Sequence, residues 1–149
     1  MSVTTADYGF LEPQTVHFDD LDGFGMLHNS HYAVLAERAW VAYWQRREVA
    51  FSRDWELLDD GYNVAKELLV GFDLPIGRPG TYGVHAWVER LGRTSLTYGF
   101  RVCSEDASLT YAHGHRTVVR LERTTLRPTE WSGRVRELCQ DLGRPASSA

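Results

Sequence analysis

Residues 18–32 read FDDLDGFGMLHNSHY, an acidic stretch with two glycines that comes directly before an amphipathic segment. Gly23 and Gly25 disfavour a regular element here, because glycine loses more conformational freedom on ordering than any other residue. Asn29 or Ser30 stands where a helix N-cap belongs. Apolar residues then recur at helical spacing, namely Tyr32, Leu35, Ala36, Ala39, Trp40 and Tyr43. The stretch therefore predicts a loop that opens into one long helix.

The rest of the chain is predicted to form a sheet. The helix is expected to end by about Ala50, and apolar residues after it alternate with a period of two. Strands are predicted at residues 11–19, 62–72, 82–88, 96–102 and 111–123, and a last short helix at 131–142. The connections between the last three strands are short, which predicts antiparallel hairpins. The fold class is therefore α+β, with a helix covering one face of a five-stranded antiparallel sheet.

The composition is that of one globular domain, residues 1–149, with flexible ends expected at about 1–8 and 143–149. A net charge of -4 does not favour nucleic acid or an anionic membrane as a partner. Cys103 and Cys139 are expected to be free thiols, since two cysteines are too few for a disulfide framework. Nothing resembles a signal peptide or a membrane span, so we expect a cytoplasmic protein.

Asp20 and Asp22 in the loop are the first candidates for chemistry. A D-x-D pair in a glycine-containing loop is most often a solvated turn or a helix cap, so spacing alone does not assign it a function. His113 and His115 lie two residues apart on one predicted strand, but no third ligand follows from the spacing. We therefore expect no metal.

The loop resembles the active-site signature of the 4-hydroxybenzoyl-CoA thioesterase/YbgC-like hotdog family. It has Phe18, the D-x-D pair, Gly25, Asn29 and Tyr32 at matching offsets. Three later stretches are similar to the third, fourth and fifth strands of that family, in the same order: RLGRTSLTYGFRV (90–102), LTYAHGHRTVV (109–119) and TTLRP (124–128). The resemblance covers about residues 16–142 and implies a hotdog fold, in which a five-stranded antiparallel sheet wraps a long central helix.

The loop also resembles the acyl-carrier-protein thioesterase pattern D-L-D-x-x-x-H-x-N-N-x-x-Y, with two departures. Met26 stands at the position of the histidine, and His28 replaces the first of the two asparagines. These departures are positions at which substrate choice is expected to differ.

The resemblance implies hydrolysis of an acyl thioester, with Asp22 as the catalytic carboxylate. Asp22 would attack the carbonyl and form a mixed anhydride, or would activate a water. The backbone N–H of Asn29 would hold the oxyanion, because the start of a helix offers unpaired N–H groups. Gly25 would let the chain pass close to the substrate.

Further residues are expected to bind the substrate, an acyl-CoA or an acyl-carrier protein. They are His28, Tyr32, Thr94 and Ser95. Arg90, Arg93 and Arg127 are candidates for the phosphates of coenzyme A, since guanidinium matches phosphate geometry, although arginines on a surface more often serve solubility. No cofactor is expected beyond the coenzyme A of the substrate. Family members pair into a continuous sheet, so the resemblance implies a homodimer or homotetramer.

Three alternatives remain open at this point. Glu67 would replace Asp22 as the catalyst, as a glutamate does in some hotdog thioesterases. A hotdog enoyl hydratase or dehydratase would use a loop histidine, where this chain has Met26. A non-catalytic acyl-binding hotdog module would have no need of a carboxylate beside an apolar tunnel. The sequence leaves the acyl group unidentified.

Overall fold

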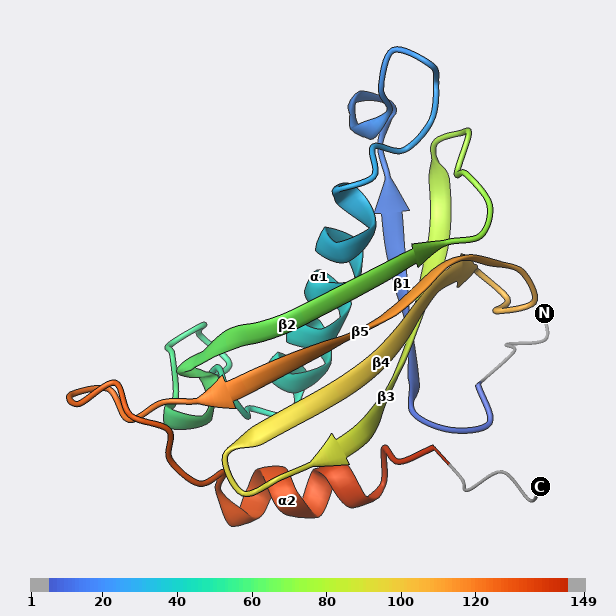
Figure 1. The fold of residues 1–149 in the computed structure, drawn as a ribbon. Helices are drawn as coiled ribbons and strands as arrows, with labels where there is room; N and C mark the ends of the chain where they lie inside the picture. Colours follow the sequence, from blue (N-terminus) through green and yellow to red (C-terminus); the bar gives the residue numbers. More distant parts are fainter. Residues whose placement is uncertain (1–5, 145–149) are drawn as a thin grey trace.

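The computed structural model describes residues 6–144 as one sheet with a long helix on one face and a short helix at its end (Figure 1). The strands are β1 (Phe10–Val16), β2 (Asn63–Phe72), β3 (Gly80–Leu91), β4 (Ser95–Ser104) and β5 (Thr110–Arg120). The helices are α1 (His31–Arg46) and α2 (Gly133–Gln140). The sheet order is β1-β3-β4-β5-β2, and every pair is antiparallel. The predicted α+β hotdog fold is confirmed.

α1 packs its apolar stripe on the sheet, as its spacing predicted. Leu35, Ala36 and Ala39 are fully buried against core residues of the strands such as Val84 and Phe100. A stripe of this width needs an apolar surface to cover it, and the sheet supplies one.

Two aromatic stacks fix the position of α1 on the sheet. Tyr43 stacks on Phe10 of β1 with ring centroids 4.0 Å apart, and Trp40 stacks on Tyr98 of β4 at 3.9 Å. Each such pair contributes about 0.5–1.5 kcal/mol beyond its buried area. They hold the second half of the helix over β1 and β4.

Several predicted boundaries differ from the observed ones, each for a local reason. β1 ends at Val16 because Phe18–Asp20 forms a 3-10 turn, in which Asp20 accepts the backbone N–H of His17 at 2.8 Å. β5 ends at Arg120 because the Glu122 carboxylate accepts backbone N–H groups from the two threonines that follow, which closes a turn. Side-chain caps of this kind compete with strand pairing.

The predicted flexible ends fall partly outside the described residues, since 1–5 and 145–149 are not described. Within the described part, the carbonyl of Tyr8 lies 2.8 Å from His85 Nε2, and Gly143 forms a bridge with Val88. Cys103 and Cys139 are buried free thiols. Among residues 6–144 there is no helix long and apolar enough to cross a membrane.

A buried ion pair joins the last turn of α1 to β1. Glu12 is 6% exposed, and both of its carboxylate oxygens accept from the guanidinium of Arg46, one of them at 3.0 Å. Removing the arginine leaves a carboxylate buried without a partner, which is costly. The pair therefore secures the end of α1 that lies far from the loop.

We expect Arg46→Met to lower the free energy of unfolding by about 2 kcal/mol, less than for a fully buried pair because Arg46 is half exposed. The control is Arg53→Met, whose ion pair with Glu48 is solvated and should contribute less than about 1 kcal/mol. Urea denaturation of both variants tests this. An equal decrease in the free energy of unfolding in the two variants would contradict the stabilising role assigned to the Glu12–Arg46 ion pair.

Candidate active site at the start of the long helix

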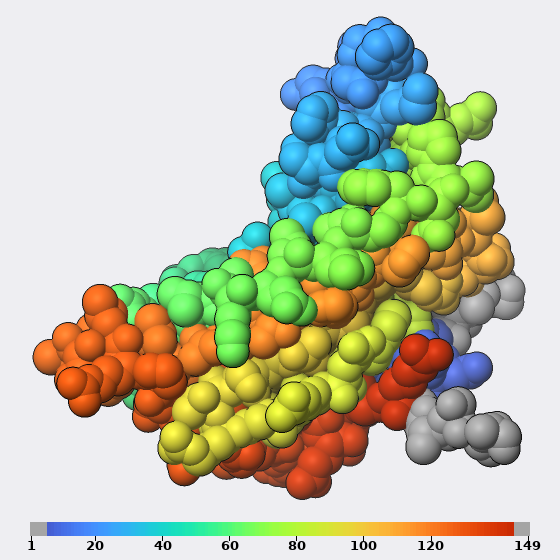
Figure 2. Space-filling view, viewed as in Figure 1, coloured from blue at the N-terminus to red at the C-terminus, as the bar shows by residue number. Residues whose placement is uncertain are grey.

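The loop between β1 and α1 forms a projecting tip of the molecule (Figures 1 and 2). Asp22 organises it: Oδ1 accepts the backbone N–H of Phe24 at 2.8 Å and of Met26 at 3.2 Å. The Asp22 N–H donates in turn to the carbonyl of Met26 at 2.7 Å. Asp22 Oδ2 accepts no hydrogen bond from residues 6–144, so one carboxylate oxygen remains available.

Asp22 lines a pocket of about 250 Å³ at the N-terminal end of α1. Asn29 and Tyr32 line it from the helix side, and Phe72 and Asp73 line it from the end of β2. The hydroxyl of buried Tyr32 accepts the backbone N–H of Ile76 at 3.0 Å, which ties the segment after β2 to α1. The pocket is therefore lined by two carboxylates, Asp22 and Asp73, and by apolar side chains such as Phe72.

The backbone N–H of Asn29 makes no hydrogen bond to any residue between 6 and 144. The backbone N–H groups of the next two residues already form hydrogen bonds. Ser30 N–H donates to His28 Nδ1 at 3.2 Å, and His31 N–H donates to the carbonyl of His28 at 2.9 Å. An unpaired N–H at the positive end of a helix dipole is a ready donor for developing negative charge.

The other aspartate of the loop, Asp20, ties the loop to α1. Its Oδ1 lies 3.2 Å from His31 Nε2, and its Oδ2 accepts the N–H of His17. The His17 N–H, followed by the charges of His31, His17 and Arg38, holds the pKa of Asp20 below its ordinary value, although desolvation opposes this. Asp20 therefore braces the loop that carries Asp22.

Gly25 has a backbone requirement of its own, in addition to the predicted closeness to the substrate. Its φ is +78°, a conformation that L side chains rarely adopt, and a Cβ there would have open space around it. The glycine is required by backbone geometry and not by close packing.

The other predicted site residues are divided between two places. Tyr32 lies at the pocket, whereas exposed His28 is not among the residues that line it and contacts Ser30 Oγ at 2.8 Å. Thr94 and Ser95 follow the end of β3, at the opposite end of the sheet from the loop (Figure 1). Arg90, Arg93 and Arg127 lie at that far end too. One chain does not bring these five residues together with Asp22.

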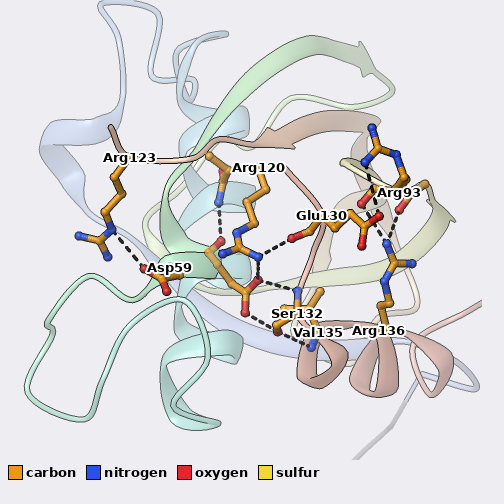
Figure 3. Close-up of polar contacts among 11 residues, drawn as sticks. Asp59, Arg93, Arg120, Arg123, Glu130, Ser132, Val135 and Arg136 are labelled. Atoms are coloured by element: carbon orange, nitrogen blue, oxygen red, sulfur yellow. Dashed lines mark hydrogen bonds and ion pairs between the residues drawn. The ribbon is translucent and has the colours of Figure 1, made fainter. Parts of the chain in front are cut away.

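An arginine-rich cluster at that far end was not anticipated from the sequence (Figure 3). Arg120 pairs with Asp60 at 3.5 Å, Arg123 with Asp59 at 3.4 Å and Arg93 with Glu130 at 3.4 Å. Arg90 and Arg127 have no ion-pair partner among residues 6–144. The cluster joins β5 to the segment before β2, a proximity that spacing in the sequence does not indicate.

Glu67, His113 and His115 do not line the Asp22 pocket, although His113 contacts Asp73, which does. His115 Nε2 is 2.7 Å from Glu67, and His113 Nδ1 is 2.8 Å from Asp73. The two histidines alternate with buried Ala112 along β5, so they point to the sheet face that α1 does not cover. No group of three or more potential metal ligands is found within residues 6–144.

Comparison with known proteins assigns the chain to a family. The sequence model described as "Thioesterase superfamily" matches residues 24–111, more than half of the chain. The chain belongs to the thioesterase superfamily. It is a thioester hydrolase. The match includes Gly25, Asn29 and Tyr32 and begins two residues after Asp22. Among curated proteins, no significant match to this thioesterase is found.

Solved structures agree with the family. A thioesterase of Thermus thermophilus, complexed with coenzyme A and Zn, is 29% identical, with a TM-score of 0.72 over 91% of this chain and 95% of its own. A Pseudomonas aeruginosa PAO1 protein has a TM-score of 0.80 at 20% identity, over 94% and 95% of the two chains. The DHNA-CoA thioesterase of Staphylococcus aureus has a TM-score of 0.68 at 18% identity, over 83% and 80%. The last two likenesses concern the fold alone.

We expect Asp20→Asn to reduce stability in a pH-dependent way. Because the pKa of Asp20 is lowered in the folded state, its charge stabilises the fold above the ordinary aspartate pKa of about 3.9, and this contribution is lost as the pH falls through the folded value. The gap in unfolding free energy between wild type and variant should therefore be larger at pH 6 than at pH 3. Asp19→Asn is the control, because the exposed Asp19 side chain has no hydrogen bond or ion pair within residues 6–144. A difference in unfolding free energy between wild type and Asp20→Asn that does not change with pH would contradict the stabilising role assigned to the Asp20 charge.

Proposed function

We propose that this thioesterase hydrolyses an acyl thioester of coenzyme A or of a carrier protein, with Asp22 as its catalytic carboxylate. One observation carries the proposal. A carboxylate oxygen of Asp22 and the backbone N–H of Asn29 are both without hydrogen-bond partners in residues 6–144, and both residues line one pocket at the start of α1.

The two groups match the two needs of the reaction. The thioester carbonyl accepts the Asn29 N–H and gains negative charge there as it becomes tetrahedral. Asp22 either attacks the carbonyl carbon, giving an acyl-aspartyl anhydride that water then cleaves, or takes a proton from the attacking water. In both routes the thiolate leaves and is protonated by solvent.

We expect Asp22→Asn to lower kcat by about 10²–10⁴-fold, because the amide is neither a base nor a nucleophile. The asparagine oxygen can still accept the N–H groups of Phe24 and Met26, so the loop and the melting temperature should be preserved. Thiol release from a panel of acyl-CoAs measures this, and Asp19→Asn is the control. Wild-type turnover in Asp22→Asn would refute the role of Asp22.

A single turnover in ¹⁸O-water separates the two routes. Label in the Asp22 carboxylate is expected only if an anhydride forms and water attacks its aspartyl carbonyl. Label in the product acid alone is expected if Asp22 activates the water, or if water attacks the acyl carbonyl of the anhydride. Trapping of the acyl-enzyme with hydroxylamine distinguishes these last two.

We further propose a homodimer formed through β2. This strand pairs only with β5, and within residues 6–144 its other edge has no partner. Val64, Leu68, Leu69 and Phe72 on it are each about half exposed, at 48%, 51%, 49% and 54%. A long, apolar, unpaired edge strand is a template for pairing with another chain. Two-fold pairing of identical edges in one sheet makes the two β2 strands antiparallel.

The dimer accounts for the divided placement of the predicted residues. In an antiparallel pairing, the start of β2 in one chain lies beside the end of β2 in its partner. The far end of the sheet, with Thr94, Ser95, Arg90 and Arg127, then comes toward the partner's Asp22 pocket. Arg90 and Arg127, which are without ion-pair partners in residues 6–144, are our candidates for the phosphates of coenzyme A. The relative from Thermus thermophilus is complexed with coenzyme A.

Light scattering should give wild type a mass of at least twice that of the 17.0 kDa chain. Leu68→Glu places a charge in the proposed interface and should shift the protein toward the single-chain mass. Leu109→Glu, at an exposed position in the hairpin between β4 and β5, should leave the mass unchanged. A monomeric wild type would contradict the dimer.

The two buried free thiols lead us to propose a reducing compartment, the cytoplasm, as the location of the protein.

A further inference from the structure

The Asp22 pocket contains a second carboxylate, that of Asp73, the residue directly after β2. The Asp73 side chain is 41% exposed, so its carboxylate is open to solvent. Asp73 Oδ2 lies 2.8 Å from His113 Nδ1, whereas Oδ1 has no hydrogen-bond partner within residues 6–144. The pocket is therefore lined by two aspartates that each have one carboxylate oxygen without a partner in this part of the chain, Asp22 Oδ2 and Asp73 Oδ1.

Backbone hydrogen bonds fix the position of Asp73. Its N–H donates to the carbonyl of Tyr111 at 2.8 Å, which anchors it to β5. Three residues later, fully buried Ile76 accepts the N–H of Leu27 at 2.8 Å and donates its own N–H to the hydroxyl of Tyr32 at 3.0 Å. The segment that carries Asp73 is therefore tied both to the sheet and to the loop and helix on the other side of the pocket, and a catalytic group needs such fixed placement.

Asp73 also lines a second hollow, of about 490 Å³, on the sheet face that α1 does not cover. His113 lines this hollow and not the Asp22 pocket, and its side chain is 56% exposed. Imidazole is a stronger base than a carboxylate, so a proton taken up by Asp73 in the pocket has a route to solvent through His113.

A neighbouring pair shows which observation matters. His115 Nε2 lies 2.7 Å from Glu67, but neither residue lines the Asp22 pocket. An exposed carboxylate–histidine pair is by itself a solvated contact of small energy. The pair of Asp73 and His113 differs because its carboxylate reaches the pocket that holds Asp22.

We infer that Asp73 is the base that activates the water for cleavage of the acyl-aspartyl anhydride, and that His113 positions Asp73 and receives the proton. This inference rests on the proposed function and makes Asp22 the nucleophile. Once Asp22 is bonded to the acyl group, its carboxylate is consumed and cannot act as a base, so the second step needs another one.

The two steps divide the work between the two aspartates. In the first, an oxygen of Asp22 bonds to the thioester carbonyl carbon, the C–S bond breaks and the thiolate leaves. In the second, Asp73 Oδ1 takes a proton from a water whose oxygen bonds to a carbonyl carbon of the anhydride, and the anhydride C–O bond breaks. The acid leaves, Asp22 is a carboxylate again, and the proton passes from Asp73 to His113 and then to solvent.

The test follows thiol release and acid formation in Asp73→Asn, with the acyl-CoA of the panel that wild type cleaves fastest. We expect kcat to fall about 10²-fold, a typical contribution of a general base, because the second step slows. The first step keeps its rate, so one thiol per active site is released in a burst, without a burst of acid. KM should fall together with kcat, which leaves kcat/KM for thiol release at the wild-type value.

Hydroxylamine gives a readout that a merely structural role would not change. It cleaves an anhydride without the help of a base, so it should raise thiol release by Asp73→Asn toward the wild-type rate, after subtraction of its direct reaction with the thioester. It should not rescue Asp22→Asn, which forms no anhydride.

His113→Gln keeps a hydrogen-bond donor for Asp73 but cannot take up the proton, and should lower kcat about tenfold with the same burst. Because His113 is exposed, this variant tests the inference even if Asp73→Asn fails to fold. The matched control is His115→Gln, which alters the neighbouring pair with Glu67 and should change neither kcat nor the burst.

Wild-type kcat in both Asp73→Asn and His113→Gln would overturn the inference. A fall in kcat/KM for thiol release as large as the fall in kcat, with no burst, would overturn it too, because Asp73 would then serve the first step or the fold. Hydrolysis that depends on Asp22, with no burst and no effect of hydroxylamine in any variant, leaves the proposed function standing and refutes the role of Asp73 alone. A wild type that cleaves no thioester refutes both.

Discussion

The packing of α1 on one face of the sheet is the constraint on which the rest of the structure depends. Leu35, Ala36 and Ala39 must be buried, and the stacks of Trp40 and Tyr43 fix where the helix lies. With the helix body fixed, its N-terminal end emerges beside the loop that leaves β1 (Figure 1). Asn29 lies directly before Ser30, the N-cap residue of α1, and its N–H has no hydrogen-bond partner within residues 6–144.

The loop meets this helix end with two aspartates that have different roles. Asp20 has a structural role, since one of its oxygens accepts the N–H of His17, directly after β1, and the other contacts His31 of α1. Asp22 is used only in part, because Oδ1 closes the loop and Oδ2 has no partner within residues 6–144. A reactive carboxylate needs this combination of rigid placement and one available oxygen.

A single chain holds the predicted site residues in two separate places. The Asp22 pocket lies at one end of the sheet, and the arginines lie at the other. The apolar edge of β2 runs between these two ends and has no partner in the described chain. The two-fold axis that we propose through that edge would cover the edge and bring the two ends of the sheet together from different chains.

The sequence by itself determined the elements and indicated the candidate site, since both depend on local order. Periods of 3.6 and two reflect which side of an element is buried, and Asp22 and Asn29 are seven residues apart in one loop. Boundaries at Asp20 and Glu122 were missed because single side-chain hydrogen bonds set them. Tertiary structure alone decided which predicted residues lie far from Asp22, such as Arg90 and Ser95. Their positions depend on the antiparallel register, which brings together residues from distant parts of the chain.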